Sequence, residues 1–389
     1  MRRYRGITFG LAALGAAAAA LLGSGAAASA ANAGTTKPSA AGITPAWPAV
    51  IFVSPHGSAR NAGNSCATAR FRSINGAVAA VRSHGTVIVC RGHYRTQAVI
   101  RRPVHLIGDR AVINAKGQRP VLPKLPGGSG IVVLRTHDVT IRGFKVTGAG
   151  FDAVLVALSR HVRVTHNVLE HNGDVGVDFN GSSRSVAAHN VANFNHGGGF
   201  LIADDIGPAR GNTVSWNVAS HNPGGCGVII AGHSRFGVRD NWVGHNWLTF
   251  NGTLPKAAGA GVVIATEVPG ETVAGNTVVG NWIYRNGIAG VTIHSHVRGQ
   301  NLNGNRILRN WIGRNNVLGD PIGLGPPVTN VPDLRTTGIL VGASSHLHVV
   351  INGNHISRNW YGVFLEGRVS ATLHHNHFRH VRVPVRVVF

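Results

Sequence analysis

The sequence predicts an all-β fold, a solenoid of stacked parallel strands that follows one short N-terminal helix. The phrase Val-x-x-Asn-x-x-x-x-Asn-x-x-x-Gly-Val recurs down the chain, and self-similarity at a fixed period is typical of a repeat architecture. Within each repeat, short runs of branched or aromatic residues alternate with Asn, Gly and His, so about three strands are expected per repeat. The hydrophobic fraction of 43% and the charged fraction of 13% exclude a disordered chain, despite 53 glycines.

The first thirty residues have the pattern of a secretory signal peptide. Three arginines occur within residues 1–5, an uncharged run rich in Ala, Leu and Gly spans 6–22, and small residues follow up to Ala30. We expect cleavage after Ala30, with Ala33 as the alternative, and a flexible leader over 31–48. The apolar run is short for a membrane span and no stop-transfer pattern follows. The sequence therefore predicts a secreted protein, extracellular or associated with the cell wall, with no transmembrane segment in the mature chain.

Residues 49–389 are expected to form one solenoid domain, with a cap over 49–95 and coils over 96–389. Apolar residues in the cap keep helical spacing at Ile74, Ala77, Val78 and Val81. A helix at this place would cover the strand edges that the first coil would otherwise offer to other chains.

Three cysteines in an exported protein suggest one disulfide and one remaining thiol. Cys66 and Cys90 bracket the segment expected to form the cap, so we pair them. Cys226 lies in an apolar run and is expected to be a buried small hydrophobic residue rather than a nucleophile.

Asparagine recurs at two positions of the repeat. The first position is occupied by Asn167, Asn190, Asn217, Asn241, Asn281, Asn310, Asn354 and Asn376, and for all but the last a second asparagine follows five residues later. The base period lies in the low twenties, with two large insertions. Parallel coils about 4.8 Å apart would bring equivalent asparagines into register, where their amides hydrogen-bond from coil to coil. We therefore expect these eight residues to form a structural ladder.

With these repeats and an N-terminal stretch that includes Phe71–Val81, Gly85–Tyr94 and Val104–Asp109, the chain resembles the right-handed parallel β-helix proteins of the pectate-lyase-like superfamily. The resemblance covers roughly residue 51 to the C-terminus and implies a helical plug before the first coils. It is specific for fold and weak for activity, because the superfamily includes lyases, hydrolases, epimerases and non-catalytic binders.

In such enzymes the substrate groove lies along the strand that follows the second asparagine. If the outer residues of each triplet on this strand face the core, the middle residues face outward. That column is Leu155, Asp178, Leu201, Ile229, Val263, Thr292, Leu340 and Phe364. It is mostly apolar, so either a loop or a partner covers it, or it is an exposed apolar stripe that binds something.

The turn just beyond the same strand is polar. Three residues past the last inward position come Ser182, Asp205, His233, Glu267, His296, Ser344 and Arg368 on successive coils. In-register stacking would place Asp205, His233, Glu267 and His296 in one row with neighbours about 5 Å apart. Asp204 and His294 would lie beside this row, and Asp178 lies on the adjoining strand, so these three are candidate binding residues.

Three interpretations of this row remain open. Alternating carboxylates and imidazoles could supply general acid and base groups, with His poised near neutral pH and a carboxylate to orient it. They could instead bind a divalent cation, although no cofactor is certain. The third interpretation is that exposed turns are polar in any protein, and that 22 histidines must fall somewhere.

Two insertions, Trp247–Gly259 and Asn316–Thr337, enter between the second asparagine and the outward strand. Long loops on one side of a solenoid commonly form its binding face. Trp247 and Arg335 are therefore candidate binding residues, and the alternative for Trp247 is that it attaches its own loop to the solenoid.

The charge balance indicates an anionic partner. Lys and Arg number 37 against 14 acidic residues, for a formal charge of +23, and Arg suits bidentate contacts with carboxylate, sulfate or phosphate. Export argues against nucleic acid, and no nucleic-acid recognition module is visible.

The leading hypothesis for function is a secreted protein that binds an extracellular, anionic polysaccharide and, if it is an enzyme, cleaves it as a lyase or glycoside hydrolase. The alternatives are a non-catalytic binding or scaffold protein of the cell envelope and a metal-carrying accessory protein. The signature motifs of alginate epimerases and pectate lyases are absent, and the oligomeric state is left open.

Overall fold

The computed structural model describes residues 48–388 except 123–124, 126, 255–258, 296 and 318–334. The predicted signal peptide and nearly all of the leader lie outside the described residues. The described residues belong to one compact unit, in which 30 strands form a single continuous sheet wound into a parallel β-helix. None of the described helices has the length and apolar character needed to cross a membrane.

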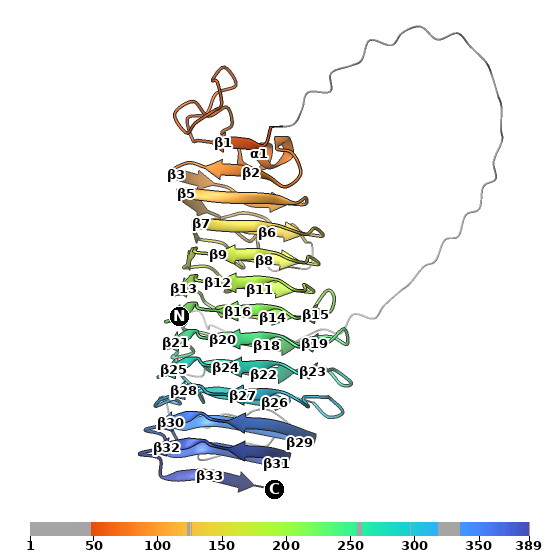
Figure 1. The fold of residues 1–389 in the computed structure, drawn as a ribbon, viewed down its shortest axis with the longest axis vertical. Coiled ribbons are helices and arrows are strands. Elements are labelled where there is room, and N and C mark those ends of the chain that lie inside the picture. The colour runs from red at the N-terminus through yellow and green to blue at the C-terminus, as the bar shows by residue number, and fades with distance from the viewer. Residues whose placement is uncertain are drawn as a thin grey trace, which may run out of the picture. The chain divides into compact units, whose positions relative to one another are not determined.

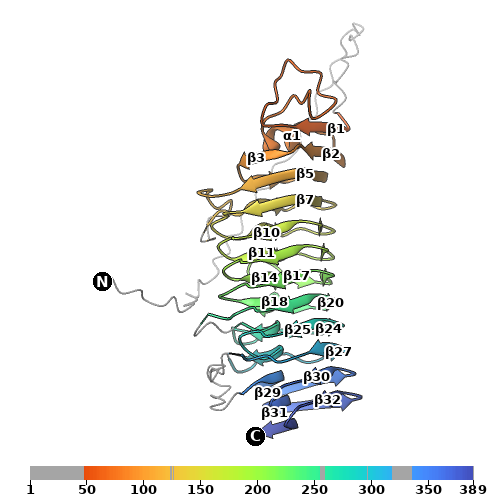
Figure 2. The same ribbon diagram turned by 90° about the vertical axis from the view of Figure 1, so that its left-hand side faces the viewer.

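Each coil contributes a strand to each of three parallel faces, here called sheets I, II and III, and Figures 1 and 2 show these strands stacked along the long axis. Sheet I contains β4 (Ala98–Ile100), β6 (Ile131–Leu134), β8 (Val154–Ala157), β11 (Val175–Asn180), β14 (Gly198–Ala203), β18 (Cys226–Gly232), β22 (Val262–Thr266), β26 (Val291–Ser295), the first parts of β29 (Thr337–Asn352) and β31 (Tyr361–His374), and β33 (Val383–Val388).

Sheet II follows sheet I in each coil. It contains β1 (Val50–Val53), β2 (Gly85–Val89), the first parts of β5 (Val104–Asn114) and β7 (Thr140–Thr147), β9 (Arg163–Thr165), β12 (Val186–Ala188), β16 (Thr213–Ser215), β20 (Trp242–Gly244), β24 (Thr277–Val279), β27 (Arg306–Leu308), and the later parts of β29 and β31.

Sheet III completes the coil. It contains β3 (Gly92–Arg95), the later parts of β5 and β7, β10 (Val168–Glu170), β13 (Val191–Asn193), β17 (Val218–Ser220), β21 (Trp247–Thr249), β25 (Trp282–Tyr284), β28 (Trp311–Ile312), β30 (His355–Ser357) and β32 (His377–Arg379). A separate three-stranded sheet of β15 (Ala209–Arg210), β19 (Val238–Arg239) and β23 (Val273–Ala274) lies at the corner between sheets I and II.

The cap has the predicted helix, α1 (Ile74–Ala80). Ser73 caps it by accepting a hydrogen bond from the Gly76 N–H, and Ile74, Ala77 and Val78 are buried. The helix packs against β1, β2 and β4, which closes the N-terminal end of the hydrophobic core. Cys66 and Cys90 form a disulfide, and Cys226 is a buried thiol whose Sγ accepts a hydrogen bond from the Ala260 N–H at 3.1 Å.

The interior contains mainly Val, Ile and Leu, which stack on one another in successive coils from the cap to the C-terminal strands. These branched side chains suit a pleated, buried surface. Their burial favours a single stacking register, because a slip of one residue would turn every apolar side chain outward.

Asparagine ladders run along the corners of the coil. In the first ladder, which lies between sheets II and III, each side-chain amide donates to the next side-chain oxygen at 2.9–3.1 Å. Its members are Asn167, Asn190, Asn217, Asn246, Asn281, Asn310, Asn354 and Asn376. A second ladder five residues later, between sheets III and I, includes Asn172, Asn195, Asn222, Asn251, Asn286, Asn315 and Asn359.

The predicted place of Asn241 in the first ladder is wrong, because Asn246 occupies that position. Asn241 belongs to a third ladder, which joins Asn212, Asn241, Asn276 and Asn305 at the corner before sheet II. In these coils three asparagines recur at intervals of five residues, so the repeat phrase fits two registers. The wrong register also misplaced the first insertion: Trp247 belongs to β21 rather than to a loop.

Candidate functional site

The predicted polar row lies at the corner between sheets I and II. Strands β14, β18 and β22 pair in register, with Ile202 beside Ile230 and Ile230 beside Ile264. Asp205, His233 and Glu267 each come three residues after these buried positions. The regular register therefore brings the three side chains together on successive coils. The fourth predicted member, His296, lies outside the described residues.

His233 stands between the two carboxylates of the row. Its Nδ1 lies 2.9 Å from Oδ1 of Asp205, and its Nε2 lies 3.9 Å from Oε1 of Glu267. The side chains of Asp205, His233 and Glu267 are 39%, 21% and 32% exposed, so all three are open to solvent. The other oxygen of Asp205 accepts a hydrogen bond from the Asn180 amide at 2.5 Å.

The electrostatics of the row hold His233 in its protonated form. Burial opposes the charged imidazolium, but the hydrogen bond and charge of Asp205, with the charges of Glu267 and Asp204, raise the pKa of His233 to about 9. Burial likewise opposes ionisation of Asp205, yet the hydrogen bond and charge of His233 lower the pKa of Asp205 below its ordinary value. At neutral pH the row therefore presents an imidazolium beside an ionised aspartate, and the expectation that His233 titrates near neutrality is corrected.

Asp204, predicted as a binding residue, is fully buried and holds the turn that carries His233. Its carboxylate accepts backbone N–H groups from His233, Ser234 and Gly237 at 2.7–3.1 Å, and the Ser234 hydroxyl at 2.9 Å. A carboxylate with these partners has no oxygen directed at solvent. Asp204 is therefore a positioning residue for His233, and its predicted contact with a ligand is corrected.

Glu271, which was not predicted from the sequence, holds the turn that carries Glu267 on the next coil. Its Oε2 accepts the backbone N–H groups of Glu267 at 2.9 Å and Val268 at 3.1 Å. Gly232 is required beneath it, because a Cβ at residue 232 would lie 1.4 Å from Oε1 of Glu271. Burial raises the pKa of Glu271 to about 7, against the lowering effect of the two N–H groups. The signal in the sequence that could have identified Glu271 was the Pro-Gly turn of Val268-Pro-Gly-Glu271, which brings this carboxylate back toward Glu267.

The Glu271→Gln substitution is expected to make the protein more stable than the native chain above about pH 7, by about 2–3 kcal/mol, and equally stable below about pH 4.5. The native pKa of about 7 exceeds the ordinary value of 4.5, so the unfolded chain releases the proton first and the native protein loses stability as pH rises through this window. Glutamine cannot ionise and can accept the same two N–H groups. Thermal melting of both proteins from pH 4 to 8 measures the difference; equal pH slopes would contradict the role of Glu271.

Three further acidic residues lie behind the row. Asp178, a predicted binding residue, is fully buried on β11, and its Oδ1 has no hydrogen-bond partner among the described residues. Burial raises the pKa of both Asp178 and Asp152 well above the ordinary value, and burial raises that of Asp174 to about 6. Asp178 therefore does not contact solvent, and its predicted role as an exposed binding residue is corrected. Asp152 and Asp174 were not anticipated.

The outward column of sheet I is buried rather than exposed, apart from Ile229, which is partly exposed. Leu155 and Thr292 are buried, and so are Leu340 and Phe364. Near its N-terminal end, Val121, Leu122, Leu125 and Ile206 pack over Val132, Leu134, Leu155 and Ala157. The interpretation of this column as an exposed apolar binding stripe is therefore wrong, and the accessible polar edge is the row at the corner.

Three other predicted residues do not join the row. His294 is buried on β26 between Ala265 and Gly342. The guanidinium of Arg335 lies 4.0 Å from the centre of the Trp360 ring, on a segment that leads from sheet III into sheet I. Trp247 is the first residue of β21 in sheet III, so the strands of sheet II lie between it and the row.

Trp247 belongs to an aromatic ladder that was also not anticipated. Its ring stacks on Trp282, and the stack continues through Trp311, His355 and His377, with ring centres 4.1–5.7 Å apart and interplanar angles of 7–16°. Stacked rings present their edges to solvent and keep their faces against one another. The ladder therefore stabilises sheet III and offers few ring faces to a sugar.

The row does not have the geometry of a chelating metal site. Asp205 and Glu267 approach opposite nitrogens of His233, so the three donors do not converge on one point. Within the described ranges, the group whose donor atoms do converge is His84, His137 and Asp138, on earlier coils. The cation interpretation of the row thus has no support from its three described members.

Residues 112–278 match the family model described as the right-handed beta helix region, and no curated protein matches the chain. The fold is similar to the A-module of mannuronan C-5 epimerase AlgE4 from Azotobacter vinelandii, with 18% identity, a TM-score of 0.56, and coverage of 80% of this chain and 91% of that chain. It is also similar to an alginate lyase from Paenibacillus sp. strain FPU-7, with 15% identity, a TM-score of 0.52, and coverage of 87% and 99%. At these identities the likeness shows the fold alone. The predicted right-handed parallel β-helix fold is confirmed.

Proposed function

We propose that this β-helix protein binds an acidic extracellular polysaccharide along the row Asp205–His233–Glu267 and cleaves it by acid–base chemistry. The observation that carries the proposal is the row itself: a partly exposed imidazolium between two carboxylates, held by a buried carboxyl group behind each of two turns. Perturbed titratable groups gathered at one solvent-open place are typical of catalytic sites. Two proteins of the same fold are named for mannuronan or alginate, and both polymers are acidic.

Guanidinium groups near the row suit an acidic polymer. Arg210, Arg235, Arg239 and Arg298 lie on the turns and short strands that follow sheet I at this corner. In the described part of the chain, the ion pairs of Lys or Arg with an acidic side chain are Arg110–Asp109 and Lys145–Glu170. These four guanidiniums have no acidic partner among the described residues, although the Arg235 Nε donates to the Pro269 carbonyl at 3.1 Å, so they can contact uronate carboxylates of a polymer that reaches this corner.

The row can perform an elimination on a bound uronate. A carboxylate, Glu267, would take the proton from the carbon next to the uronate carboxyl group, and a guanidinium would stabilise the negative charge that develops there. The electron pair of that C–H bond forms a carbon–carbon double bond as the glycosidic C–O bond breaks. His233, oriented by Asp205, would give its proton to the leaving oxygen. The products are an unsaturated uronate at one new end and, at the other, a reducing end that carries the protonated oxygen.

A panel of polymers tests the proposal. The untagged chain is incubated with alginate, polygalacturonate and a glycosaminoglycan, and with neutral dextran as the control. New ultraviolet absorbance from the unsaturated uronate on an acidic polymer is the expected result. Reducing ends without that absorbance would indicate a hydrolase instead. The absence of any product and of any retention on the acidic polymers would overturn the proposal.

Non-catalytic binding is the second candidate, and the arginines at this corner, which have no acidic partner among the described residues, favour it. It predicts retention on immobilised acidic polymer with no product. Because guanidinium contacts are screened by salt, retention would fall steeply between low and physiological ionic strength. Unchanged retention in Glu267→Gln together with zero turnover in the native chain would establish this function over the enzymatic one.

Export is part of the same proposal, since an extracellular polymer requires it. The charged, apolar and small-residue pattern of residues 1–30 supports export. N-terminal sequencing of protein from the culture medium should give Ala31, or Gly34 for the alternative cleavage. Protein that retains Met1 and stays in the cell would contradict it.

A further inference from the structure

A second cluster of titratable side chains lies on the first coils, away from the row. It occupies the corner immediately before sheet II, where β2, β5, β7 and β9 are paired in register. The residue two positions before the paired residues Thr86, His105, Thr140 and Arg163 is His84, Pro103, Asp138 and His161, respectively. Stacking therefore places two histidines and an aspartate in one column, and the short Pro103 between them lets His84 reach Asp138.

The backbone at this corner directs these side chains outward. His84, Asp138 and His161 have φ values of 58°, 52° and 53°, in the left-handed region. Their N–H groups donate to the next coil, to Pro103, Arg160 and Ser183, so the corners are held by main-chain hydrogen bonds and the side chains are left for other contacts. His137, next to Asp138, is paired with Arg160 by an isolated bridge.

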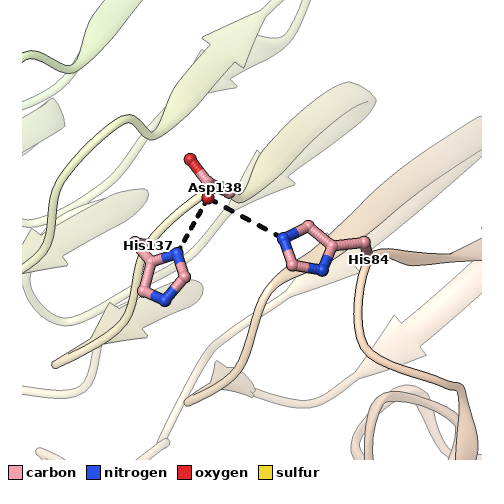
Figure 3. A group of neighbouring side chains, drawn as sticks. All are labelled: His84, His137 and Asp138. Carbon is pink, nitrogen blue, oxygen red and sulfur yellow. Dashed lines mark hydrogen bonds and ion pairs between the residues drawn. The ribbon is translucent and has the colours of Figure 1, made fainter.

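The donor atoms converge on the Asp138 carboxylate. Its Oδ2 lies 2.8 Å from Nδ1 of His137 and 3.7 Å from Nε2 of His84, and the donor atoms of these three residues all lie within 4.8 Å of one another. Figure 3 shows the two imidazole rings on either side of the carboxylate. The other oxygen, Oδ1, lies 3.4 Å from Nδ1 of His161.

The cluster borders a surface hollow of about 310 Å³, which is also lined by His105, Arg163 and Arg184. The four cluster side chains are 39–56% exposed, so an ion can enter without rearrangement of the fold. The guanidiniums of Arg163 and Arg184 would hold a small anion, such as chloride or a carboxylate, in the hollow beside any ion bound by the cluster.

We propose that His84, His137 and Asp138 bind a divalent transition-metal ion, with Zn²⁺ as the best match, while His161 orients the Asp138 carboxylate through its other oxygen. Imidazole nitrogens and one carboxylate oxygen are the donors that Zn²⁺ accepts at about 2.0–2.2 Å in tetrahedral sites. Ca²⁺ and Mg²⁺ prefer oxygen donors and fit this set poorly. Zn²⁺ binding distinguishes this site from a metal-free ion-pair cluster, which would use the same contacts.

The site would connect coils that are distant in sequence. His84 belongs to the capped N-terminal coil, Asp138 to a coil two further along, and His161 to the next. An ion bound to His84, His137 and Asp138 would stabilise the folded chain by mass action, because the unfolded chain does not preserve the arrangement.

The test uses the untagged chain, stripped with chelator and dialysed into a chloride buffer without phosphate. It is titrated with Zn²⁺ in competition with a chromophoric chelator, and with Co²⁺ while visible absorption is recorded. We expect one Zn²⁺ per chain, a rise in the melting temperature on Zn²⁺ addition, and the intense visible bands of tetrahedral Co²⁺.

Substitutions identify the ligands. His84→Asn, Asp138→Asn and His161→Asn are chosen because asparagine tolerates the left-handed backbone, and each is expected to weaken Zn²⁺ binding at least about tenfold. His375→Asn is the matched control, because His375 is an exposed histidine with φ of 50° on a C-terminal coil. Circular dichroism of each variant establishes that it is folded; Asp138→Asn, nearly isosteric, decides the matter if His84→Asn does not fold.

Two results would overturn the proposal. One is Zn²⁺ binding too weak to compete with the chelator. The other is binding that His84→Asn and Asp138→Asn leave unchanged. His233→Ala should leave Zn²⁺ binding intact, so this site and the polysaccharide row can fail independently of one another.

Discussion

The Asn246→Ala substitution is expected to lower the free energy of unfolding by about 3–5 kcal/mol, a large part of the stability of an ordinary domain. Asn246 is 1% exposed and fills the middle of the first ladder. Its Oδ1 accepts from the backbone and side-chain nitrogens of Asn217 at 2.9 and 3.0 Å, and its Nδ2 donates to the Val214 carbonyl and Asn281 Oδ1, both at 2.9 Å. Alanine would leave several of these buried groups without partners, at about 1–3 kcal/mol each.

Urea denaturation followed by circular dichroism measures the loss, with Asn352→Ala as the matched control. Asn352 ends the sheet II part of β29, is partly exposed, and has no side-chain hydrogen bond within the described residues. Its replacement should change the denaturation midpoint little. If the two variants lose the same stability, the ladder contributes through packing alone and the hydrogen-bond argument is wrong.

The fold could be predicted because short-range sequence patterns indicate both its strands and the corners between them. Three brief apolar runs per repeat define the three faces, and asparagine at fixed offsets marks corners where a side chain must bond to the next coil. Both patterns survive insertions, because an extra loop leaves the flanking strands in register.

The register of one coil could not be read in the same way. Asn241, Asn246 and Asn251 are spaced by five residues, as are Asn212, Asn217 and Asn222. Three corners of one coil therefore carry the same residue, and the phrase matches at more than one of them. Only the contacts with the preceding coil, where Asn217 bonds to Asn246, decide which corner is which.

The residues of the candidate site whose positions depend only on strand register were predicted correctly. The residues whose roles depend on burial were not. Counting from the strand located Asp205, His233 and Glu267, because β14, β18 and β22 run in register through the turn. The same count could not show that Asp178 lies beneath other residues. Nor could it show that Glu271 folds back from four residues later to bond the Glu267 N–H.

The metal cluster shows a different limit. His84, Asp138 and His161 are spaced irregularly in the sequence, since the first coils lack the asparagine phrase that aligned the later ones. The alignment becomes visible only through the pairing of β2, β5, β7 and β9. The repeat period therefore could not predict which residues of the first coils lie side by side.

Asp205→Asn is expected to move the alkaline limit of polysaccharide cleavage from about pH 9 to near neutrality. In the native chain, Asp205 is the main group that raises the pKa of His233 to about 9, so the imidazolium acid persists through neutral pH and activity should fall only as pH passes that value. Asparagine keeps the shape and removes the charge. The pH dependence of kcat/KM measures the shift, and nuclear magnetic resonance of the His233 ring reports its pKa without reference to activity.

His233→Ala should lower kcat/KM by about 10²–10⁴-fold at neutral pH, the usual contribution of a general acid, while binding of the polymer persists through the guanidiniums. Asp109→Asn replaces an exposed carboxylate distant in sequence from the row; it is the control and should leave both quantities unchanged.

The stability of the native protein should also depend on the titration of His233. Its folded pKa lies above the unfolded value of about 6.5, so the contribution of His233 to stability is complete below pH 6.5 and is lost as pH rises through about 9. Asp205→Asn should remove this alkaline loss. If the ring of His233 titrates near 6.5 in the native chain, the imidazolium is not held, and His233 would act as a base or as a structural residue instead.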